Sequence, residues 1–313
     1  MMNTLKSIKV FAPATVSNLG SGFDIIGFPI ENVGDTIKAT QNEEQVVRIT
    51  DISGYKGIPF EASENVASYA VIKLLEKLGV NKGFDIAIEK AVKPGSGIGS
   101  SASSSVAAVY AVNLLLGKPF TDSELIEFAM EGEGLASGGK HADNVAPALM
   151  GGITVLRSYK PLDVIRIEPP GQLRVVLLHP QIEIKTREAR NILPKQIPLK
   201  DAVQQWGNVA GLISGLYSSD YEMIGRSMED VIVEPRRSSL IPGYDQLKSA
   251  ALEAGALGCT ISGSGPSVFA LTKGDQVARR VENAMKDAYS KQEIPFNVYS
   301  SSVSSEGAKL IDK

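Results

Sequence analysis

Residues 94–105 read Pro-Gly-Ser-Gly-Ile-Gly-Ser-Ser-Ala-Ser-Ser-Ser, the most informative stretch of this sequence. Its alternating glycines allow the backbone to approach a ligand closely. The preceding residues 84–89 alternate between apolar and polar side chains, as a β-strand does. Residues 102–116 are apolar on nearly all sides, which predicts a buried helix that Gly117 and Pro119 end. The pattern therefore predicts a strand, a glycine-rich loop and a buried helix in succession.

The loop is a candidate phosphate site because of the helix that follows it. The first amides of a helix lack partners within the helix and carry the positive end of its dipole, and both properties favour an anion. No Gly-Lys-Ser/Thr follows at P-loop spacing, and the Gly-x-Gly-x-Gly order differs from the dinucleotide fingerprint. The loop alone leaves two interpretations open: a nucleotide phosphate site, or a turn that lets the helix pack tightly on a sheet.

Composition excludes several classes of protein. The 313 residues carry a net charge of -3, with 43% hydrophobic and 21% charged residues, which predicts a globular protein of two domains. We expect no nucleic-acid partner because no basic stripe with interleaved aromatic residues occurs, and no membrane span because no uncharged apolar run is long enough. Residues 1–9 lack the apolar segment of a signal peptide. The single cysteine, Cys259, permits no internal disulfide, so we expect a buried thiol and a cytoplasmic protein.

Turn residues divide the chain into two halves that both mix helices and strands. The sequence Pro-Pro-Gly at 169–171 is the strongest break, and we place a boundary there between domains at 1–168 and 169–313. Alternation of the two element types predicts an α+β sandwich. Strands are expected at 36–50, 84–90, 153–156, 164–167, 173–178, 267–272 and 296–303, and helices at 66–78, 121–130, 201–218, 221–230, 243–254 and 275–290.

Two further segments of the first half are rich in ligand-type side chains. Residues 12–24 include Asn18, which can hydrogen-bond a polar ligand in either sense, and Asp24, which can pair with an ammonium group. A turn with a capping aspartate explains these two residues equally well. Residues 133–147 begin with Glu133, which is a candidate Mg²⁺ ligand because Mg²⁺ takes one or two carboxylates together with phosphate oxygens.

The second half adds a glycine–serine turn at 260–267 and arginines at 187, 190, 236 and 237. The guanidinium fork of arginine binds a carboxylate through two hydrogen bonds, although exposed arginines are mostly solvated. Two glycine-rich turns in different domains could line one cleft.

Together these segments resemble the GHMP kinase superfamily. Residues 12–24, 94–105 and 261–267 match its three motifs in family order, and the resemblance covers nearly the whole chain. Within the superfamily, the stretches that resemble the homoserine kinase family are 17–24, 140–147, 186–190 and 234–242.

The resemblance implies a two-domain GHMP kinase fold of the α+β class. The N-terminal domain would be similar to domain 2 of ribosomal protein S5, the C-terminal domain would be ferredoxin-like, and the active site would lie between them. ATP would be the phosphoryl donor, Mg²⁺ the cofactor and L-homoserine the acceptor, whose side-chain hydroxyl is phosphorylated in a step toward threonine. Members of the family are often homodimers.

The resemblance also implies roles for individual positions. Mg²⁺ would be held by Glu133 with Ser104 or Ser105, and Asp143 and Asn144 would face the reacting hydroxyl. Homoserine would contact Asn18, Asp24, Asp143, Asn144, Arg190 and Arg237. The ATP phosphates would lie against Lys93, Pro94, Gly95, Ser96, Gly97, Ile98, Gly99, Ser100, Ser101, Ala102 and Ser103.

One position departs from the wider superfamily. Several relatives have a lysine where this chain has Thr15, and that lysine supports an aspartate that activates the substrate hydroxyl. Because phosphoryl transfer depends mainly on positioning and charge stabilisation, we expect direct in-line attack without an obligatory strong base. Asp143 as a base remains an open alternative.

The sequence has two alternative interpretations. A GHMP kinase for another small alcohol, such as mevalonate, would have no ammonium group for Asp24 to bind. A non-catalytic relative that only binds a small molecule would be expected to lose Glu133 or the glycine loop, and this chain retains both.

Overall fold

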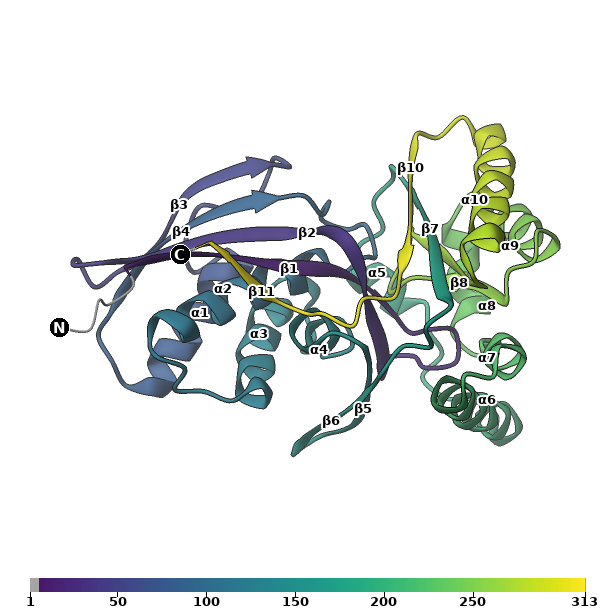
Figure 1. Ribbon diagram of the computed structural model, residues 1–313, viewed down its shortest axis with the longest axis horizontal. Coiled ribbons are helices and arrows are strands. Elements are labelled where there is room, and N and C mark those ends of the chain that lie inside the picture. The colour runs from purple at the N-terminus through teal and green to yellow at the C-terminus, as the bar shows by residue number, and fades with distance from the viewer. Residues whose placement is uncertain (1–5, 313) are drawn as a thin grey trace.

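The structure is a computed structural model that describes residues 6–312. Two β-sheets follow one another along the long axis of the molecule, and helices pack against both (Figure 1). This arrangement confirms the predicted two-domain α+β fold. Among the helices of residues 6–312, none combines the length and the apolar character needed to cross a bilayer.

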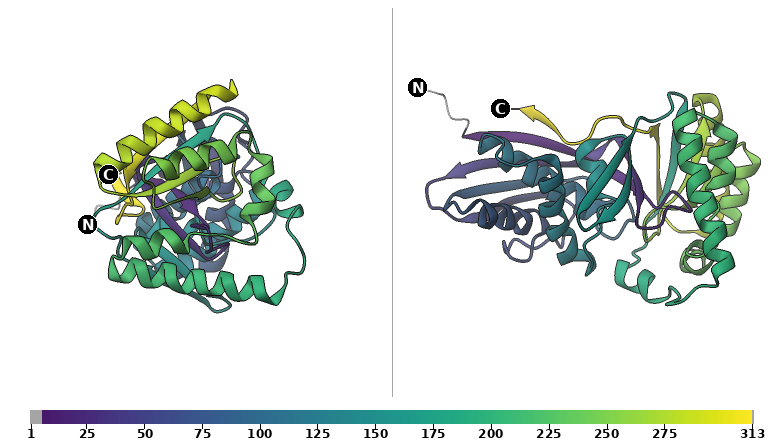
Figure 2. Two further views of the ribbon diagram at one scale, coloured as in Figure 1. Left: turned by 90° about the vertical axis from the view of Figure 1, so that its right-hand side faces the viewer. Right: turned by 90° about the horizontal axis from the view of Figure 1, so that it is seen from below.

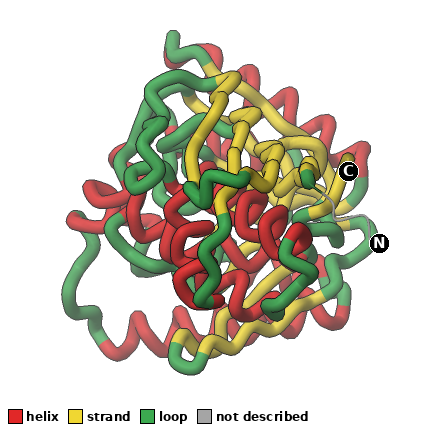
Figure 3. Tube along the Cα trace, turned by 90° about the vertical axis from the view of Figure 1, so that its left-hand side faces the viewer, coloured by secondary structure: helices red, strands yellow, loops and turns green. Residues whose placement is uncertain are grey.

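The first sheet contains β1 (Ser7–Ser17), β2 (Ile26–Asn42), β3 (Val47–Gly54), β4 (Gly83–Lys90), β5 (Ile153–Tyr159), β6 (Leu162–Ile167) and β11 (Lys309–Asp312). Its main path is β11-β1-β2-β4-β3, and β5 pairs with β2 and β6. All pairs are antiparallel except β3 with β4. Seen along the molecule, the helices of this half gather on one side of the strands (Figure 3). They are α1 (Val66–Leu78), α2 (Ser100–Leu115), α3 (Asp122–Ser137) and α4 (Val145–Met150).

The second sheet contains β7 (Leu173–Pro180), β8 (Gly258–Ile261), β9 (Val268–Lys273) and β10 (Phe296–Ser302), in the antiparallel order β10-β7-β9-β8. Helices stack on the outer end of the molecule (Figure 2). These are α5 (Thr186–Asn191), α6 (Leu199–Ser218), α7 (Tyr221–Ser227), α8 (Glu234–Arg237), α9 (Tyr244–Glu253) and α10 (Asp275–Tyr289), with 3₁₀ turns at Ser238–Leu240 and Ser290–Gln292.

Apolar packing joins the two sheets. Strand β7 alternates its side chains between two clusters, so that Val176 packs with α9 and α10, whereas Val175 packs with α6, α7 and the first sheet. In the second of these clusters the rings of Phe28 and Phe269 meet edge to face with centroids 5.9 Å apart. Cys259 is buried in the cluster around α9 and α10, and burial raises the pKa of its thiol to about 12, which confirms the expected buried thiol.

Some local predictions were wrong. The strand expected over 36–50 is two strands, because β2 ends at Asn42 and a turn precedes β3. The helix that opens at the Thr121 capping box continues to Ser137 instead of ending at Met130. The end of β1 occupies part of the segment interpreted as a turn, and the four-residue strands β8 and β11 were not predicted.

The proposed boundary at 168/169 lies between β6 and β7, and the domain division stays a prediction. The chain crosses between the sheets a second time, after β10. Val303 bridges Ile30, and β11 then pairs with β1. The last strand of the segment 169–313 therefore belongs to the first sheet.

Candidate active site

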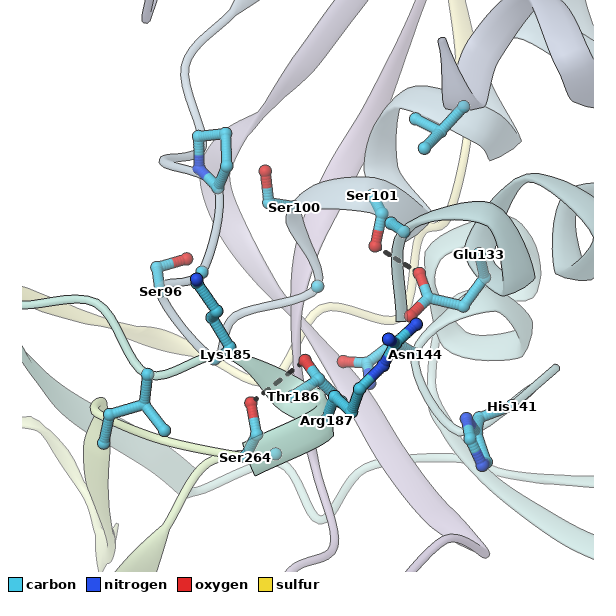
Figure 4. A pocket seen from close by; sticks show the side chains of 18 of the residues that line it. Ser96, Ser100, Ser101, Glu133, His141, Asn144, Lys185, Thr186, Arg187 and Ser264 are labelled. Atoms are coloured by element: carbon cyan, nitrogen blue, oxygen red, sulfur yellow. Dashed lines mark hydrogen bonds between the residues drawn. The ribbon is translucent and has the colours of Figure 1, made fainter. Parts of the chain in front are cut away.

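A cavity of about 720 Å³ lies where the two halves of the chain meet. The glycine loop and the start of α2 form one wall, and the segment between β7 and α5 faces them (Figure 4). Further lining residues come from 17–24, 57–66, 88–90, 133–144, 186–190 and 237–264. One cavity therefore contains parts of every motif that the sequence singled out.

The glycine loop adopts a conformation that requires its glycines. Gly97 has a φ of +77°, and a Cβ there would lie 2.6 Å from the carbonyl oxygen of Gly265. The second glycine–serine turn holds the loop in place, because Ser262 Oγ donates to Gly97 O at 2.7 Å and Ser267 Oγ donates to Ser96 O at 2.7 Å. The two turns thus support one another, and the loop is fixed before any ligand binds.

The helix that follows begins at the wall of the cavity. Gly99 caps α2 with no side-chain hydrogen bond, so no side chain of the cap satisfies the first N–H groups of α2. The cavity is lined by residues 94–97, 99–101 and 104 of this segment. Lys93, Ile98, Ala102 and Ser103 lie outside its lining, and Ser103 is buried with its hydroxyl donating to Ala12 O at 2.7 Å.

A buried ion pair that the sequence did not reveal supports this segment from behind. The Lys90 ammonium pairs with the carboxylate of Asp35, and both side chains are almost fully buried. Lys90 Nζ also donates to Ser100 O at 2.6 Å and to Ser104 Oγ at 2.8 Å. The Asp35 carboxylate accepts from the amides of Ala91 and Val92, each at 3.0 Å. This network fixes the end of β4 relative to the first turn of α2.

The structure brings a different serine to Glu133 from the two expected. Ser101 Oγ donates directly to the Glu133 carboxylate, and both residues line the cavity. Ser104 is committed to Asp35, to which it donates at 2.6 Å. Ser105 is buried outside the lining and donates to Val66 O at 3.3 Å.

The donor set at Ser101 and Glu133 fits Mg²⁺ better than a transition metal. Within residues 6–312 no group of three or more His, Cys, Asp or Glu side chains could hold an ion. One carboxylate and one hydroxyl next to a phosphate site are hard oxygen donors, and Mg²⁺ is commonly held by one or two carboxylates with phosphate oxygens and water.

The expected acceptor residues also converge on the cavity. Asp24 and Arg190 form a two-bond ion pair, with nitrogen–oxygen distances of 2.9 and 3.0 Å. Asn18 accepts from the Asp24 amide at 3.1 Å and donates to Gly263 O at 2.9 Å. Arg237 is only 2% exposed and donates to Gly263 O at 2.8 Å, and burial lowers its pKa to about 10.

Asn144 and Asp143 line the same cavity. The Asn144 amide is held from both sides, because Thr15 Oγ1 donates to it at 2.8 Å and it donates to Ser17 Oγ at 3.0 Å. Asp143 is 4% exposed, and its Oδ1 has no hydrogen-bond partner. Burial, with a smaller contribution from the charge of Asp24, raises the pKa of Asp143 to about 7.

The lining also includes titratable side chains to which the sequence gave no specific role. His141 Nε2 lies 4.0 Å from Asp24 Oδ2, and burial lowers the pKa of this histidine. Lys185 and Arg187 enter the cavity from the segment opposite α2. Lys185 caps the start of α5 and Arg187 lies in its first turn, and of the two the sequence marked only Arg187, as one of four arginines.

Family models match both halves of the chain. The model described as the GHMP kinases N terminal domain matches residues 65–152, and the model described as GHMP kinases C terminal matches residues 212–291. A homoserine kinase from Chlorobium phaeobacteroides (strain BS1) is 47% identical over 98% of this chain and 100% of its own length. A homoserine kinase from Methanococcus maripaludis is 38% identical over 91% of this chain and 94% of its own length.

Solved structures give the same result. The crystal structure of a homoserine kinase from Cytophaga hutchinsonii has a TM-score of 0.96 and 51% identity, over 99% of both chains. A mevalonate kinase from L. major, in complex with R-mevalonate, has a TM-score of 0.72 at 20% identity over 97% of this chain and 99% of its own, so it shares the fold. The chain therefore belongs to the homoserine kinase family of the GHMP kinases.

Proposed function

We infer that this protein transfers the γ-phosphoryl group of ATP to the side-chain hydroxyl of L-homoserine. The observation that carries this inference is a single cavity with two chemically different ends. One end has backbone amides and a carboxylate–hydroxyl pair suited to a metal-bound triphosphate. The other end has one carboxylate and two arginines suited to the ammonium and carboxylate groups of an amino acid.

We propose that Asp24 binds the ammonium group of homoserine, and that Arg190 and Arg237 bind its carboxylate. Arg190 Nε is a buried donor without a hydrogen-bond partner, which a substrate carboxylate would satisfy. Both guanidinium groups lie over the Phe23 ring, at 5.4 and 5.1 Å from its centroid. This stacking limits their orientations, so the arginine forks are pre-organised for the carboxylate.

We assign the triphosphate to the glycine loop and the first amides of α2. Ser101 and Glu133 would hold Mg²⁺, in place of the expected Ser104 or Ser105, because Ser101 donates to Glu133 whereas Ser104 donates to Asp35 and Ser105 to Val66 O. When bound, this ion supplies positive charge that neutralises the oxygens of the β- and γ-phosphates.

We propose direct in-line attack by the homoserine hydroxyl, without an obligatory strong base. Thr15, at the position of the lysine in other relatives, orients Asn144 and cannot support an aspartate base by charge. The alternative is that Asp143 takes the proton, for which a pKa near 7 is suitable. In single-turnover measurements, loss of about 10²–10⁴-fold in the chemical step of Asp143→Ala, with binding intact, would favour the base and refute our proposal. Asn144→Ala should slow the same step, because the amide orients the hydroxyl.

The activity is tested by coupled ADP release with L-homoserine, D-homoserine, L-serine, L-threonine, mevalonate and galactose. We expect L-homoserine to be the preferred acceptor. Turnover of a different alcohol, with none of L-homoserine, would overturn the assignment in favour of another GHMP kinase activity. Acceptor binding without ADP release from any of the six would favour the non-catalytic alternative.

We further propose a homodimer that pairs through α6. Leu199, Val203, Trp206 and Tyr217 are 70%, 55%, 63% and 63% exposed, at the spacing of a heptad seam. An exposed apolar stripe of this kind is typical of an interface, and two copies can cover it symmetrically. Trp206→Glu should shift the sedimentation coefficient to that of a monomer. Gln204→Glu, on the same helix away from the seam, should leave it unchanged.

We propose a reducing, cytoplasmic location, which the single buried Cys259 thiol supports. We also propose the domain division at 168/169.

A further inference from the structure

The cations that line the cavity differ in whether they already have partners. Three of them already have an assignment: Lys90 pairs with the buried Asp35, and Arg190 and Arg237, which contact Asp24 and backbone carbonyls, belong to the proposed acceptor site. Lys185 and Arg187 line the same cavity, are exposed, and form no ion pair with any residue of the part of the chain that the structure describes. Among the described residues of the lining, these two cations are needed neither for the buried Lys90–Asp35 pair nor for the proposed acceptor site, so their charge can face the phosphates.

The segment that carries them crosses the cavity from one half of the molecule to the other. Glu183 packs so closely on Gly95 that a Cβ there would lie 2.8 Å from Glu183 Cγ. Thr186 Oγ1 lies 3.4 Å from Ser264 Oγ. The Arg187 guanidinium reaches the C-terminal end of α3, where Nη2 would be 3.4 Å from a Cβ at Gly138. The segment is thus anchored against both glycine turns and against α3.

These contacts hold the segment so that the Lys185 and Arg187 side chains extend into the cavity next to the glycine loop. Figure 4 shows Lys185 extending toward the side of the cavity that holds Ser96, and Arg187 toward the side that holds Glu133 and Asn144. Ser101, Glu133 and Asn144 mark the point at which we placed the metal ion and the reacting hydroxyl. A cation between these groups would face the phosphoryl group during its transfer.

We propose that Arg187 binds the γ-phosphoryl oxygens of ATP during transfer, and that Lys185 binds the β- and γ-phosphates of the ground state. The proposal rests on the proposed kinase function. In the reaction the γ-phosphorus–bridging oxygen bond breaks, a bond from phosphorus to the homoserine oxygen forms, and ADP retains the bridging oxygen. The hydroxyl proton leaves to solvent.

The two side chains suit different tasks. Negative charge spreads over the three equatorial oxygens of the transferring phosphoryl group. The planar guanidinium of Arg187 can donate two parallel hydrogen bonds to two of them, whereas the Lys185 ammonium acts as a point charge. Arg187 therefore contributes mainly to kcat and Lys185 mainly to nucleotide affinity.

The test compares Arg187→Ala, Arg187→Lys and Lys185→Ala with a matched control, Lys195→Ala. Lys195 is an exposed lysine shortly after α5 and does not line the cavity. Steady-state kinetics give kcat and both KM values, and calorimetry gives the dissociation constants of ADP and AMP. Because all three residues are exposed, the thermal unfolding temperature should change little.

We expect Arg187→Ala to lower kcat about 10²–10³-fold while the dissociation constant of ADP changes little. Arg187→Lys should recover only part of this loss, because lysine lacks the fork. Lys185→Ala should weaken ADP about tenfold and leave AMP unchanged, since AMP lacks the β-phosphate. Activity and ADP affinity of both alanine variants within threefold of the wild type and of Lys195→Ala would overturn the proposal.

The calorimetric result separates this proposal from the proposed function. If the wild type phosphorylates another alcohol, the acceptor assignment fails, but the losses in kcat and ADP affinity still support the two cations. If L-homoserine is phosphorylated and neither cation affects kcat or ADP binding, the function stands and the proposal for Lys185 and Arg187 fails.

Discussion

The most informative single substitution is Asp143→Asn, because it removes a buried charge while preserving shape. Asp143 is 4% exposed, its Oδ1 is unpartnered, and its pKa is raised from 3.8 to about 7, first by burial and second by Asp24. The folded protein therefore favours the protonated acid. As the pH rises from about 4 to about 7 the unfolded chain ionises at Asp143 before the folded chain does, so stability falls across this window.

The size of the effect follows from the shift. The pKa of Asp143 rises from 3.8 to about 7, a shift of about three pKa units, and each unit corresponds to ~1.4 kcal/mol. The ionised Asp143 thus costs the folded state about 4 kcal/mol above pH 7 and almost nothing below pH 4. Asparagine cannot ionise, so the stability advantage of Asp143→Asn over the wild type should grow by about 4 kcal/mol between pH 4 and pH 8.

The assay is urea unfolding of both proteins at pH 4, 5, 6, 7 and 8. A matched control is Asp230→Asn, at a carboxylate that is 8% exposed and accepts from Gln205 Nε2 and from the amides of residues 232–234. Because Asp230 is fully partnered, its substitution should destabilise the protein. Identical pH profiles for the wild type and Asp143→Asn would refute the reasoning, as would an advantage that shrinks with rising pH.

Three other substitutions test separate parts of the site. Asp35→Ala leaves the buried Lys90 ammonium unpaired and should lower the free energy of unfolding by about 3–5 kcal/mol in urea titrations; a loss under about 1 kcal/mol would contradict the buried pair. Gly97→Ala introduces a Cβ 2.6 Å from Gly265 O and should weaken ADP binding in calorimetry, whereas Gly171→Ala, with open space around it, should not. Asp24→Asn should raise KM for L-homoserine about 10–100-fold and leave ADP affinity unchanged; a larger effect on ADP would place Asp24 at the wrong end of the cavity.

Local patterns predict the phosphate loop and α2 well, because glycine spacing and a continuous apolar run act over a few residues. They do not predict which serine meets Glu133. Ser105 lies on the same face of α2 as Ser101 but one turn, about 5.4 Å, further along the helix. Ser104 is turned toward Asp35, which is 69 residues earlier in the chain. A residue's distance along a helix from the cavity, and its contact with a residue far away in the sequence, cannot be recognised from the neighbouring residues.

The acceptor residues illustrate the same limit. Asp24 and Arg190 are 166 residues apart, and neither neighbourhood contains a pattern that specifies the other. The family resemblance assigned both residues to one site. The structure adds their neighbours, because Asn18 accepts from the Asp24 amide and the Phe23 ring lies against Arg190 and Arg237. The buried pair of Lys90 and Asp35 could not be predicted from the sequence, because a lysine or an aspartate in a strand usually lies on the surface.

The second crossing of the chain has a mechanical consequence. The crossing after β10 runs beside the end of the first sheet, where Gly152 N donates to Ser304 O and Arg166 donates to Ser305 O, both at 2.9 Å. The two halves of the protein are therefore joined by two crossings of the chain in addition to the buried cluster that contains Phe28 and Phe269. These connections are redundant, because a break in one crossing leaves the other crossing and the apolar cluster in place. Redundant connections favour one fixed relative position of the two walls of the cavity.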